Sequence, residues 1–235
     1  MTAEQMHIQF KMGLDKSDTL SNPNFEPEEI NVWLNKAQDR FIKTRYSHDL
    51  KQETFEETQK RTDDLREVIV EETLPPSDTQ EPVKPNGVLF NLPGVVDHRP
   101  YYWFAINEEC QIRYRNCKDG YVYERKRVKP IQHDDYNKVI DDPFNKPTRG
   151  KIVRLMHDHY AELIGDGTYE IQTYILRYIK RPQEITAGIP TIADSDCELA
   201  DHTHDEIVDN AVTMALENIA NPRYQTRMLE DMRQE

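Results

Sequence analysis

The stretch YYWFAINEECQIRYRNCKDGYVYERKRVKPI, residues 101–131, decides which fold class the sequence predicts. Its segments are short, aromatic and β-branched, a composition that favours extended backbone. Asp119 and Gly120 stand between two of these segments, and an Asp-Gly pair is a strong signal for a tight turn between strands. The stretch therefore predicts a β-hairpin.

The strand pattern continues on both sides of this hairpin. It begins near Gly87 and returns, after an interruption, between residues 151 and 185. The interruption, residues 132–147, predicts one short helix that must end by Pro143, because proline cannot continue a helix. Strands thus account for most of the middle of the chain.

Helical patterns flank this middle region. The clearest helix begins at Pro27, with glutamates around its first turn and Lys43 and Arg45 near its end, as the helix dipole favours. Its apolar residues share one face: Ile30, Trp33, Leu34, Ala37, Phe41 and Ile42. A second helix with a weaker apolar stripe is predicted over residues 52–70.

A third helix is predicted in CELADHTHDEIVDNAVTMALENIA, residues 197–220. Thr203 followed by Glu206 matches the capping box, in which the two side chains satisfy backbone amides at the start of a helix. An apolar face comes next, made of Ile207, Val208, Ala211, Val212, Ala215, Leu216 and Ile219. The cluster of acids and histidines therefore has a structural interpretation.

Together these patterns predict an α+β fold, in which a helical bundle of N- and C-terminal helices carries an inserted antiparallel β-rich region. The predicted organisation is an extended arm over residues 1–26, the bundle over 27–75 and 200–220, the β-rich region over 76–199, and a C-terminal tail helix over 221–235.

The composition is polar and acidic. Of the 235 residues, 37% are hydrophobic and 31% are charged, and 43 Asp and Glu against 30 Lys and Arg give a formal net charge of -13. This charge argues against a protein whose main task is to grip phosphates. It suits a surface along which nucleic acid passes without sticking, because like charges repel over short, screened distances.

The three cysteines are an odd number, and the N-terminal sequence shows no secretory leader, so we expect assembly in a reducing cytoplasm. Six residues separate Cys110 from Cys117, which is wider than the usual pairs of structural zinc sites. No apolar run approaches the length of a membrane span. Neither a cofactor nor a metal is expected.

His157, Asp158 and His159 form the most enzyme-like group in the sequence. On a strand the two imidazoles would share a face, as a metal-dependent hydrolase would require. The alternative is a polar strand face, and we favour it because no third ligand is fixed by sequence spacing. For His202 and His204, at the start of the third helix, the alternatives are a ligand or pH-switch role and a purely structural one, which we favour because the two side chains need not converge. The sequence also lacks a glycine-rich phosphate loop.

Two further segments have open interpretations. Arg125, Lys126 and Arg127 lie in a basic, aromatic stretch that predicts either a nucleic-acid-binding strand or an edge strand protected by charge, with Lys126 on the opposite side from the two arginines. Near the C-terminus an apolar stripe either folds back on the protein or docks on a partner. Its members are Tyr224, Met228, Leu229 and Met232.

Several segments taken together resemble a known family. They are FKMGLDKSDTLSNPNFEPEEINVWLNKAQDRFIKTRY, FEETQKRTDDLREVI, YNKVIDDPFNKPTRGKIVRL, YILRYIKRPQEI and CELADHTHDEIVDNAVTMALE. In this order they resemble the head-to-tail connector, or ring, proteins of tailed double-stranded DNA bacteriophages, especially the crAss-like group. The likeness extends over about residues 10–216.

The resemblance implies a structural protein of the virion without enzymatic activity. It implies a homo-oligomeric ring, a dodecamer matching the portal, which stacks with other ring or tail proteins below the portal protein and forms part of the channel for the phage genome. It also implies that the genome passes without sequence-specific binding.

Overall fold

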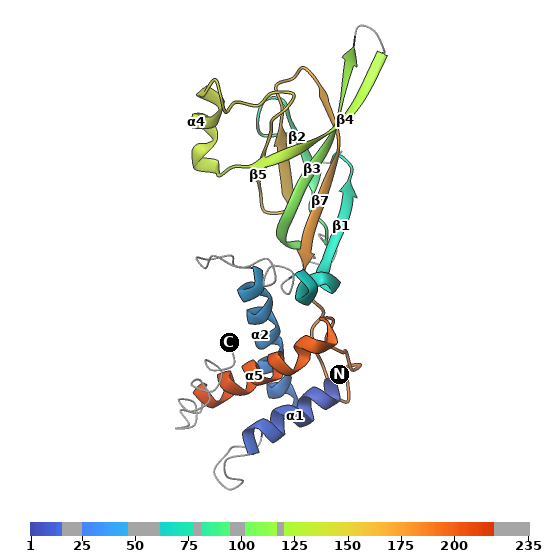
Figure 1. Ribbon diagram of the computed structural model, residues 1–235, viewed down its shortest axis with the longest axis vertical. Helices are drawn as coiled ribbons and strands as arrows, with labels where there is room; N and C mark the ends of the chain where they lie inside the picture. Colours follow the sequence, from blue (N-terminus) through green and yellow to red (C-terminus); the bar gives the residue numbers. More distant parts are fainter. Residues whose placement is uncertain (16–24, 47–61, 78–80, 95–101, 117–119, 219–235) are drawn as a thin grey trace. The chain divides into compact units, whose positions relative to one another are not determined.

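The computed structural model describes residues 1–15, 25–46, 62–77, 81–94, 102–116 and 120–218. The chain forms two compact units, which can be followed in Figure 1. Unit 1 comprises Met1–Val68 and Pro182–Glu235, and unit 2 comprises Ile69–Arg181. Unit 1 is therefore built from two separate stretches of chain, and unit 2 is the insertion between them.

Unit 2 is built on a seven-stranded sheet of order β1-β7-β3-β4-β5-β6-β2. The strands are β1 (Ile69–Leu74), β2 (Gly87–Asn91), β3 (Tyr102–Asn116), β4 (Gly120–Pro130), β5 (Ile152–Met156), β6 (Tyr160–Ile164) and β7 (Glu170–Lys180). All neighbours are antiparallel except β4 and β5. This parallel pair needs a crossover connection, and that connection contains the 3-10 turn η2 (His133–Asp135) and helix α4 (Tyr136–Asp141).

The sheet of unit 2 curls until its two edge strands meet. Pro76, just after β1, forms a β-bridge with Phe90 of β2, and the Ser77 amide donates to the Leu89 carbonyl at 2.7 Å. The ring of Phe90 also lies 5.6 Å from that of Tyr174 in β7. The curl encloses one buried cluster, formed by Leu74, Phe90, Leu92, Cys110, Ile112, Val128, Ile152, Ala161, Leu163, Tyr169, Ile171, Tyr174, Leu176 and Tyr178.

A buried ion pair connects β3 and β5 beside this cluster. The Arg154 guanidinium donates through Nε to Glu108 Oε2 at 2.8 Å and through a second nitrogen to Oε1, and the Tyr174 hydroxyl donates to Oε2 at 2.8 Å. Burial opposes the charged form of Arg154, but the hydrogen bonds and the negative charge of Glu108 outweigh it and raise the pKa of Arg154. Such a pair is tolerated inside a protein because each charge has a partner.

Unit 1 contains helices α1 (Ala3–Asp15), α2 (Pro27–Tyr46) and α5 (His204–Asn218), with 3-10 turns η1 (Arg66–Val68) and η3 (Asp201–Thr203). Helix α5 packs against both α1 and α2. A capping box starts α1, because the Thr2 amide donates to Gln5 Oε1 at 3.1 Å and the Gln5 amide donates to Thr2 Oγ1 at 3.3 Å. The apolar stripe of α1 is buried: Ala3, Met6, Phe10 and Leu14.

A ladder of side-chain amides on α2 holds the segment that returns from unit 2. Asn31 donates to and accepts from the backbone of Ala187, at 3.3 and 3.2 Å, and Asn35 does the same with Ile185 at 3.0 and 2.8 Å. Gln38 donates to the Gln183 carbonyl at 3.1 Å. The three amides are spaced along one face of α2, and they contact alternate residues of an extended chain. The amide ladder thus replaces a neighbouring strand.

The predicted fold is wrong in its main feature. A seven-stranded curled sheet dominates the chain, whereas the helices α1, α2 and α5 have 13, 20 and 15 residues and do not make a helical bundle with a sheet inserted into it. The sheet is also mixed, because β4 and β5 are parallel. The coarser prediction of an α+β protein is consistent with this architecture.

Two predicted elements also differ from the structure. Residues 3–15, expected in an extended arm, form α1, because their apolar side chains recur at helical spacing and are buried. The helix expected over residues 52–70 lies partly outside the described residues, and its predicted end is wrong. Ile69–Leu74 is strand β1, paired with β7 from Ile69 opposite Ile179. The short helix expected before Pro143 is confirmed as α4.

Replacing Arg154 with methionine should lower the free energy of unfolding by about 3–5 kcal/mol, because it leaves the Glu108 carboxylate buried without its charged partner. Urea unfolding measures the loss. Arg113→Met is the matched control, since Arg113 pairs with Glu170 at the surface, where an ion pair contributes about 0–1 kcal/mol. Equal losses in the two variants would contradict the structural role of the buried pair.

Acid should weaken unit 1 through His7. Burial lowers the pKa of His7 below its ordinary 6.5, and its Nε2 donates to Asn31 Oδ1 at 2.7 Å. Below pH 6.5 the His7 side chain binds a proton in the unfolded chain but much less readily in the folded chain. The stability present at neutral pH is therefore lost as the pH falls. Thermal melts should show a smaller loss in His7→Gln, which keeps a donor to Asn31 without titrating. If the variant loses as much thermal stability in acid as the unmodified chain, other groups than His7 cause the effect.

Candidate assembly surfaces

The outer face of the β3–β4 hairpin is basic and aromatic. Within the described chain, residues 120–127 of β4 pair only with β3, and β5 joins at Val128. Figure 1 shows the outer ends of both strands extending past the rest of the sheet. Exposure alternates along β4, and the exposed side chains include Tyr121, Tyr123, Arg125, Arg127 and Lys129. In the sheet β4 lies between β3 and β5, so the edge-strand prediction applies only to residues 120–127, and Lys126 lies on the face opposite the two arginines as the alternation predicts.

The opposite face of the hairpin neutralises its own charges. Lys126 Nζ lies 2.7 Å from Glu124 Oε2, and the Tyr114 hydroxyl donates to Glu124 Oε1 at 2.7 Å. The hydrogen bond from Lys126, followed by that from Tyr114, lowers the pKa of Glu124. The Arg149 guanidinium lies 3.8 Å from the Tyr114 ring centre. These four side chains satisfy one another.

The cations of the outer face differ from one another in their surroundings. Arg113 pairs with Glu170 there, and Glu109 stands opposite Arg127 in the register. No side chain of the described residues forms an ion pair with Arg125, Arg127 or Lys129. Tyr121 and Tyr123 remain 60% and 55% exposed beside them. We name Tyr121, Tyr123, Arg125, Arg127 and Lys129 the hairpin face.

The charge of the chain is divided unequally between the units. Unit 2 contains 17 basic and 17 acidic residues and is formally neutral, so the whole formal charge of -13 belongs to unit 1, which contains 13 basic and 26 acidic residues. Within unit 1, residues 182–218 hold nine acids and neither Lys nor Arg. Unit 1 is therefore strongly acidic, and residues 182–218 form its most acidic continuous stretch.

Helix α5 and the turn before it present part of this charge on one face. Asp201, Asp205 and Asp209 recur every fourth residue, and all three are exposed. Because residues four apart lie above one another on a helix, Asp205 and Asp209 share one face of α5, and Asp201 precedes them in η3. We name these three residues the α5 acidic stripe.

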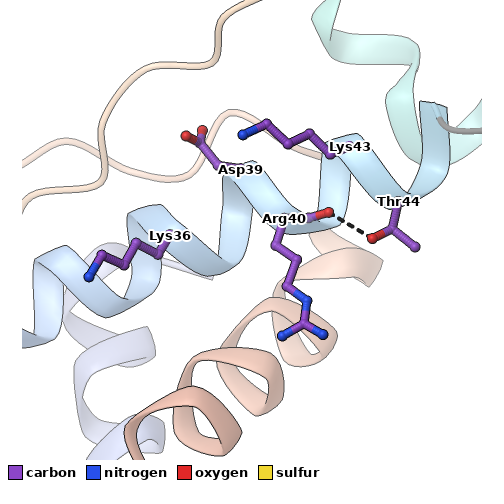
Figure 2. Close-up of a pocket in the computed structure, with 5 residues that line it drawn as sticks. All are labelled: Lys36, Asp39, Arg40, Lys43 and Thr44. Atoms are coloured by element: carbon purple, nitrogen blue, oxygen red, sulfur yellow. Dashed lines mark hydrogen bonds between the residues drawn. The ribbon is translucent and has the colours of Figure 1, made fainter. Parts of the chain in front are cut away.

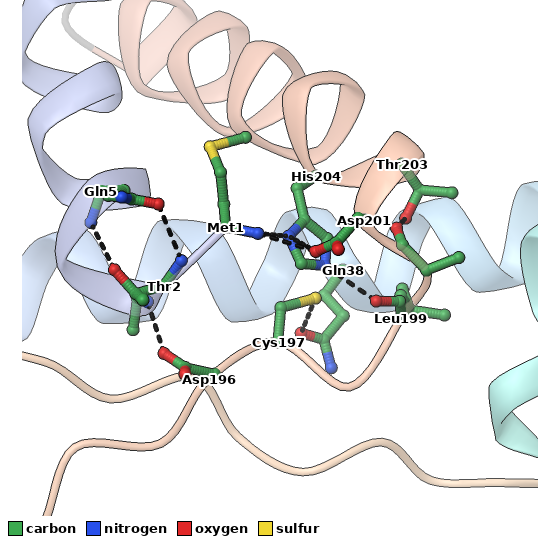
Figure 3. Close-up of polar contacts among 12 residues, drawn as sticks. Met1, Thr2, Gln5, Gln38, Asp196, Cys197, Leu199, Asp201, Thr203 and His204 are labelled. Atoms are coloured by element: carbon green, nitrogen blue, oxygen red, sulfur yellow. Dashed lines mark hydrogen bonds and ion pairs between the residues drawn. The ribbon is translucent and has the colours of Figure 1, made fainter.

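The histidines beside this stripe serve local structure, and Figure 3 shows the contacts of His204. His204, which is buried, has Nε2 2.8 Å from the Leu199 carbonyl, to which it donates, and so its Nδ1 accepts from the Met1 ammonium at 3.0 Å. Met1 also donates to Asp201 at 2.8 Å, and this hydrogen bond lowers the pKa of Asp201. His202 Nε2 lies 2.8 Å from Asp64 Oδ1.

The predicted capping box at the start of α5 is wrong. The Thr203 hydroxyl donates to the Ala200 carbonyl at 2.8 Å instead of accepting from an amide. Glu206 accepts two hydrogen bonds of 2.9 Å from Arg45 of α2 instead of returning to the start of the helix. The competing partner from another helix decides this geometry, and the sequence of α5 alone does not reveal it.

The two histidines proposed for a metal site do not converge on one point. His157 Nε2 lies 3.0 Å from Oε2 of fully buried Glu162, whereas His159, half exposed, lies 3.0 Å from Asp158. Across the described ranges, no three or more His, Cys, Asp or Glu side chains are grouped closely enough to hold a metal ion. The hydrolase interpretation therefore has no ligand set.

Helix α2 carries a second set of exposed cations, which Figure 2 shows around a shallow hollow of about 550 Å³. Lys36, Arg40 and Lys43 line it together with Asp39 and Thr44. Asp39 places a carboxylate among these cations, and the Lys36 ammonium lies 4.7 Å from the Trp33 ring centre. The α2 surface thus mixes three cations with one carboxylate.

The chain has further features that the function must accommodate. Phe144 is 90% exposed on the loop after α4, and sequence reasoning missed it.

Burial raises the pKa of the Cys110 and Cys197 thiols to about 12 and about 11, so both remain protonated. Among the described helices, none combines the length and the apolar character needed to cross a membrane. The stripe of Tyr224, Met228, Leu229 and Met232 lies outside the described residues.

Comparison with known proteins gives a consistent match. The family model described as phage tail ring protein 3/4 matches residues 1–227. Ring protein 3 of Bacteroides phage crAss001 is 25% identical over 232 residues, covering 92% of this chain and 95% of that protein. Ring protein 4/5 of the same phage is 29% identical over 107 residues, covering 38% of this chain and 44% of that protein.

Proposed function

Because the chain belongs to the phage tail ring protein 3/4 family, we propose that it is a ring subunit of the head-to-tail connector that binds below the portal and forms part of the DNA channel. It is a structural protein of a crAss-like phage virion and not an enzyme. The observation that carries the proposal is the family match over almost the whole chain.

The mechanism is geometric and electrostatic. A ring of copies multiplies the formal charge of -13, and carboxylates that face the lumen repel the phosphates of the genome. Screening limits this repulsion to about 8–10 Å at physiological salt, so it acts only on DNA close to the wall. The genome then slides through without sequence-specific binding.

The partners are those that this arrangement requires. Each copy contacts two neighbours through different faces, as a closed ring with cyclic symmetry demands. Twelve copies match a dodecameric portal protein on one side, and another ring or tail protein binds the other side. The subunits assemble in the cytoplasm of the bacterial host. The C-terminal stripe of Tyr224, Met228, Leu229 and Met232 docks onto a neighbouring protein of the stack.

The mass of the particle tests this function. Light scattering and electron microscopy of the purified chain, alone and mixed with the portal protein of the same phage, should reveal rings of twelve copies and a complex of ring and portal. A chain that remains monomeric under both conditions and is absent from purified virions would contradict the proposal.

The C-terminal stripe predicts a second outcome. Met228→Ser combined with Met232→Ser should weaken binding to the protein that contacts this segment by at least tenfold, because each buried methionine contributes about 1.5–3 kcal/mol. Co-sedimentation with the portal and with each neighbouring ring protein measures the loss. Thr226→Ala with Gln234→Ser, in the same segment but off the stripe at helical spacing, is the matched control. Unchanged binding to every partner by the methionine variant would assign docking elsewhere.

A further inference from the structure

The hairpin face and the α5 acidic stripe have matching spacings. Arg125, Arg127 and Lys129 alternate on one strand, so successive cations lie about 6.6–6.8 Å apart. Asp205 and Asp209 of the stripe are four residues apart on α5, a rise of about 6 Å, whereas Asp201 lies before them in η3 and pairs with the Met1 ammonium. The spacing of the two α5 carboxylates therefore differs from that of two successive cations by only about 1 Å, which flexible arginine and lysine side chains can absorb.

From this match we propose that the hairpin face of one copy docks on the α5 acidic stripe of the next copy in the ring. The inference rests on the proposed function, and it names the surfaces that join neighbouring subunits. Every copy supplies both surfaces, one basic and one acidic, as a contact between two different faces requires.

Two observations favour the hairpin face over the cations of α2 as the partner of the stripe. The hairpin face combines arginines with two exposed tyrosines, the residue types enriched at the centres of protein interfaces. On α2, the Lys36 ammonium already contacts the Trp33 ring.

DNA is the competing occupant of the hairpin face, because phosphates also bind arginine and aromatic rings stack on bases. A row of exposed cations facing the genome would hold it by releasing its counterions. A channel through which DNA slides needs a wall that does not hold the phosphates. Docking on a neighbour would cover these cations with carboxylates and leave the acidic excess of unit 1 to face the genome.

The charges and the tyrosines contribute differently to this contact. Exposed ion pairs are individually weak and are screened by salt, so they mainly orient the approach of two copies and select the register. Tyr121 and Tyr123 supply apolar area that leaves water when the surfaces meet. Self-assembly should therefore weaken as salt is added without disappearing abruptly.

Charge exchange tests the contact on the full-length chain. Variant A carries Arg125→Glu and Arg127→Glu, and variant B carries Asp205→Lys and Asp209→Lys. Asp201 is kept because it holds the Met1 ammonium. Each variant alone places like charges at every contact and should self-associate at least tenfold more weakly than the unmodified chain in analytical ultracentrifugation. An equimolar mixture restores opposite charges at every contact and should form particles with A and B in equal amounts.

The control variant reverses the same number of exposed cations on α2, with Lys36→Glu and Arg40→Glu. It should assemble like the unmodified chain. Circular dichroism of each variant verifies that the fold is retained, and recovery of assembly in the mixture verifies it independently for A and B.

The outcomes separate the two proposals. If A or B alone assembles normally, or their mixture fails while the unmodified chain forms rings, this contact is wrong and the ring function remains. If the α2 variant fails and A does not, the stripe docks on α2 and the contact is again wrong. If A keeps self-assembly but loses binding to a short DNA duplex in fluorescence anisotropy, the hairpin face binds nucleic acid instead. If the unmodified chain forms no ring alone, with portal or in virions, the ring function itself fails.

Discussion

The amide ladder between α2 and residues 183–187 is the constraint on which unit 1 depends. Unit 1 is made of two stretches separated by the whole of unit 2, so its closing contact must recognise a chain that returns after more than a hundred residues. Asn31 and Asn35 each satisfy both backbone groups of one residue, and Gln38 satisfies a third carbonyl. Because an unpaired buried backbone group costs about 1–3 kcal/mol, a shift of register by one residue would be expensive.

The ladder also fixes the segment on its C-terminal side. Residues 183–187 lead into the loop that contains Asp196, whose carboxylate accepts from the Ala3 amide at the start of α1 at 2.6 Å. The same loop precedes η3 and α5, where Asp201 and His204 hold the Met1 ammonium. The position of the α5 acidic stripe on unit 1 therefore depends on a register set by three uncharged amides.

Local signals were sufficient for some elements and insufficient for others. The hairpin, its alternating exposure and helix α2 could be predicted, because turn chemistry and side-chain period are properties of neighbouring residues. Strand β1 could not be predicted from local signals, because Ile69 and Val70 become a strand through pairing with β7, more than a hundred residues away. For α1 a signal did exist, namely the Thr2 and Gln5 capping box ahead of the apolar stripe.

Some residues of the candidate surfaces could likewise be predicted from the sequence, and others could not. The cations of the hairpin face could be predicted from the alternation of side chains along the strand. The partners of Lys126 and His202 differ in this respect: Glu124 pairs with Lys126, and Asp64 pairs with His202. Glu124 is two residues from Lys126, but Asp64 is 138 residues from His202. Which carboxylates of α5 remain exposed depends likewise on how α1 and α2 cover the helix. Burial across the fold, and not sequence spacing, separates the charges that stabilise the subunit from those available to a neighbour.

A contact made of exposed charges suits a subunit that must assemble at one place. Two exposed ion pairs at about 0.2–1 kcal/mol each, with two partly exposed tyrosines, make a weak interface between two free copies. When copies are held side by side on a portal, each contact forms at a high effective concentration, and closing the ring gives every copy two contacts in place of one. In the proposed arrangement the portal would let rings form at a lower subunit concentration than the free chain needs, and the same contact becomes stable once the circle is complete.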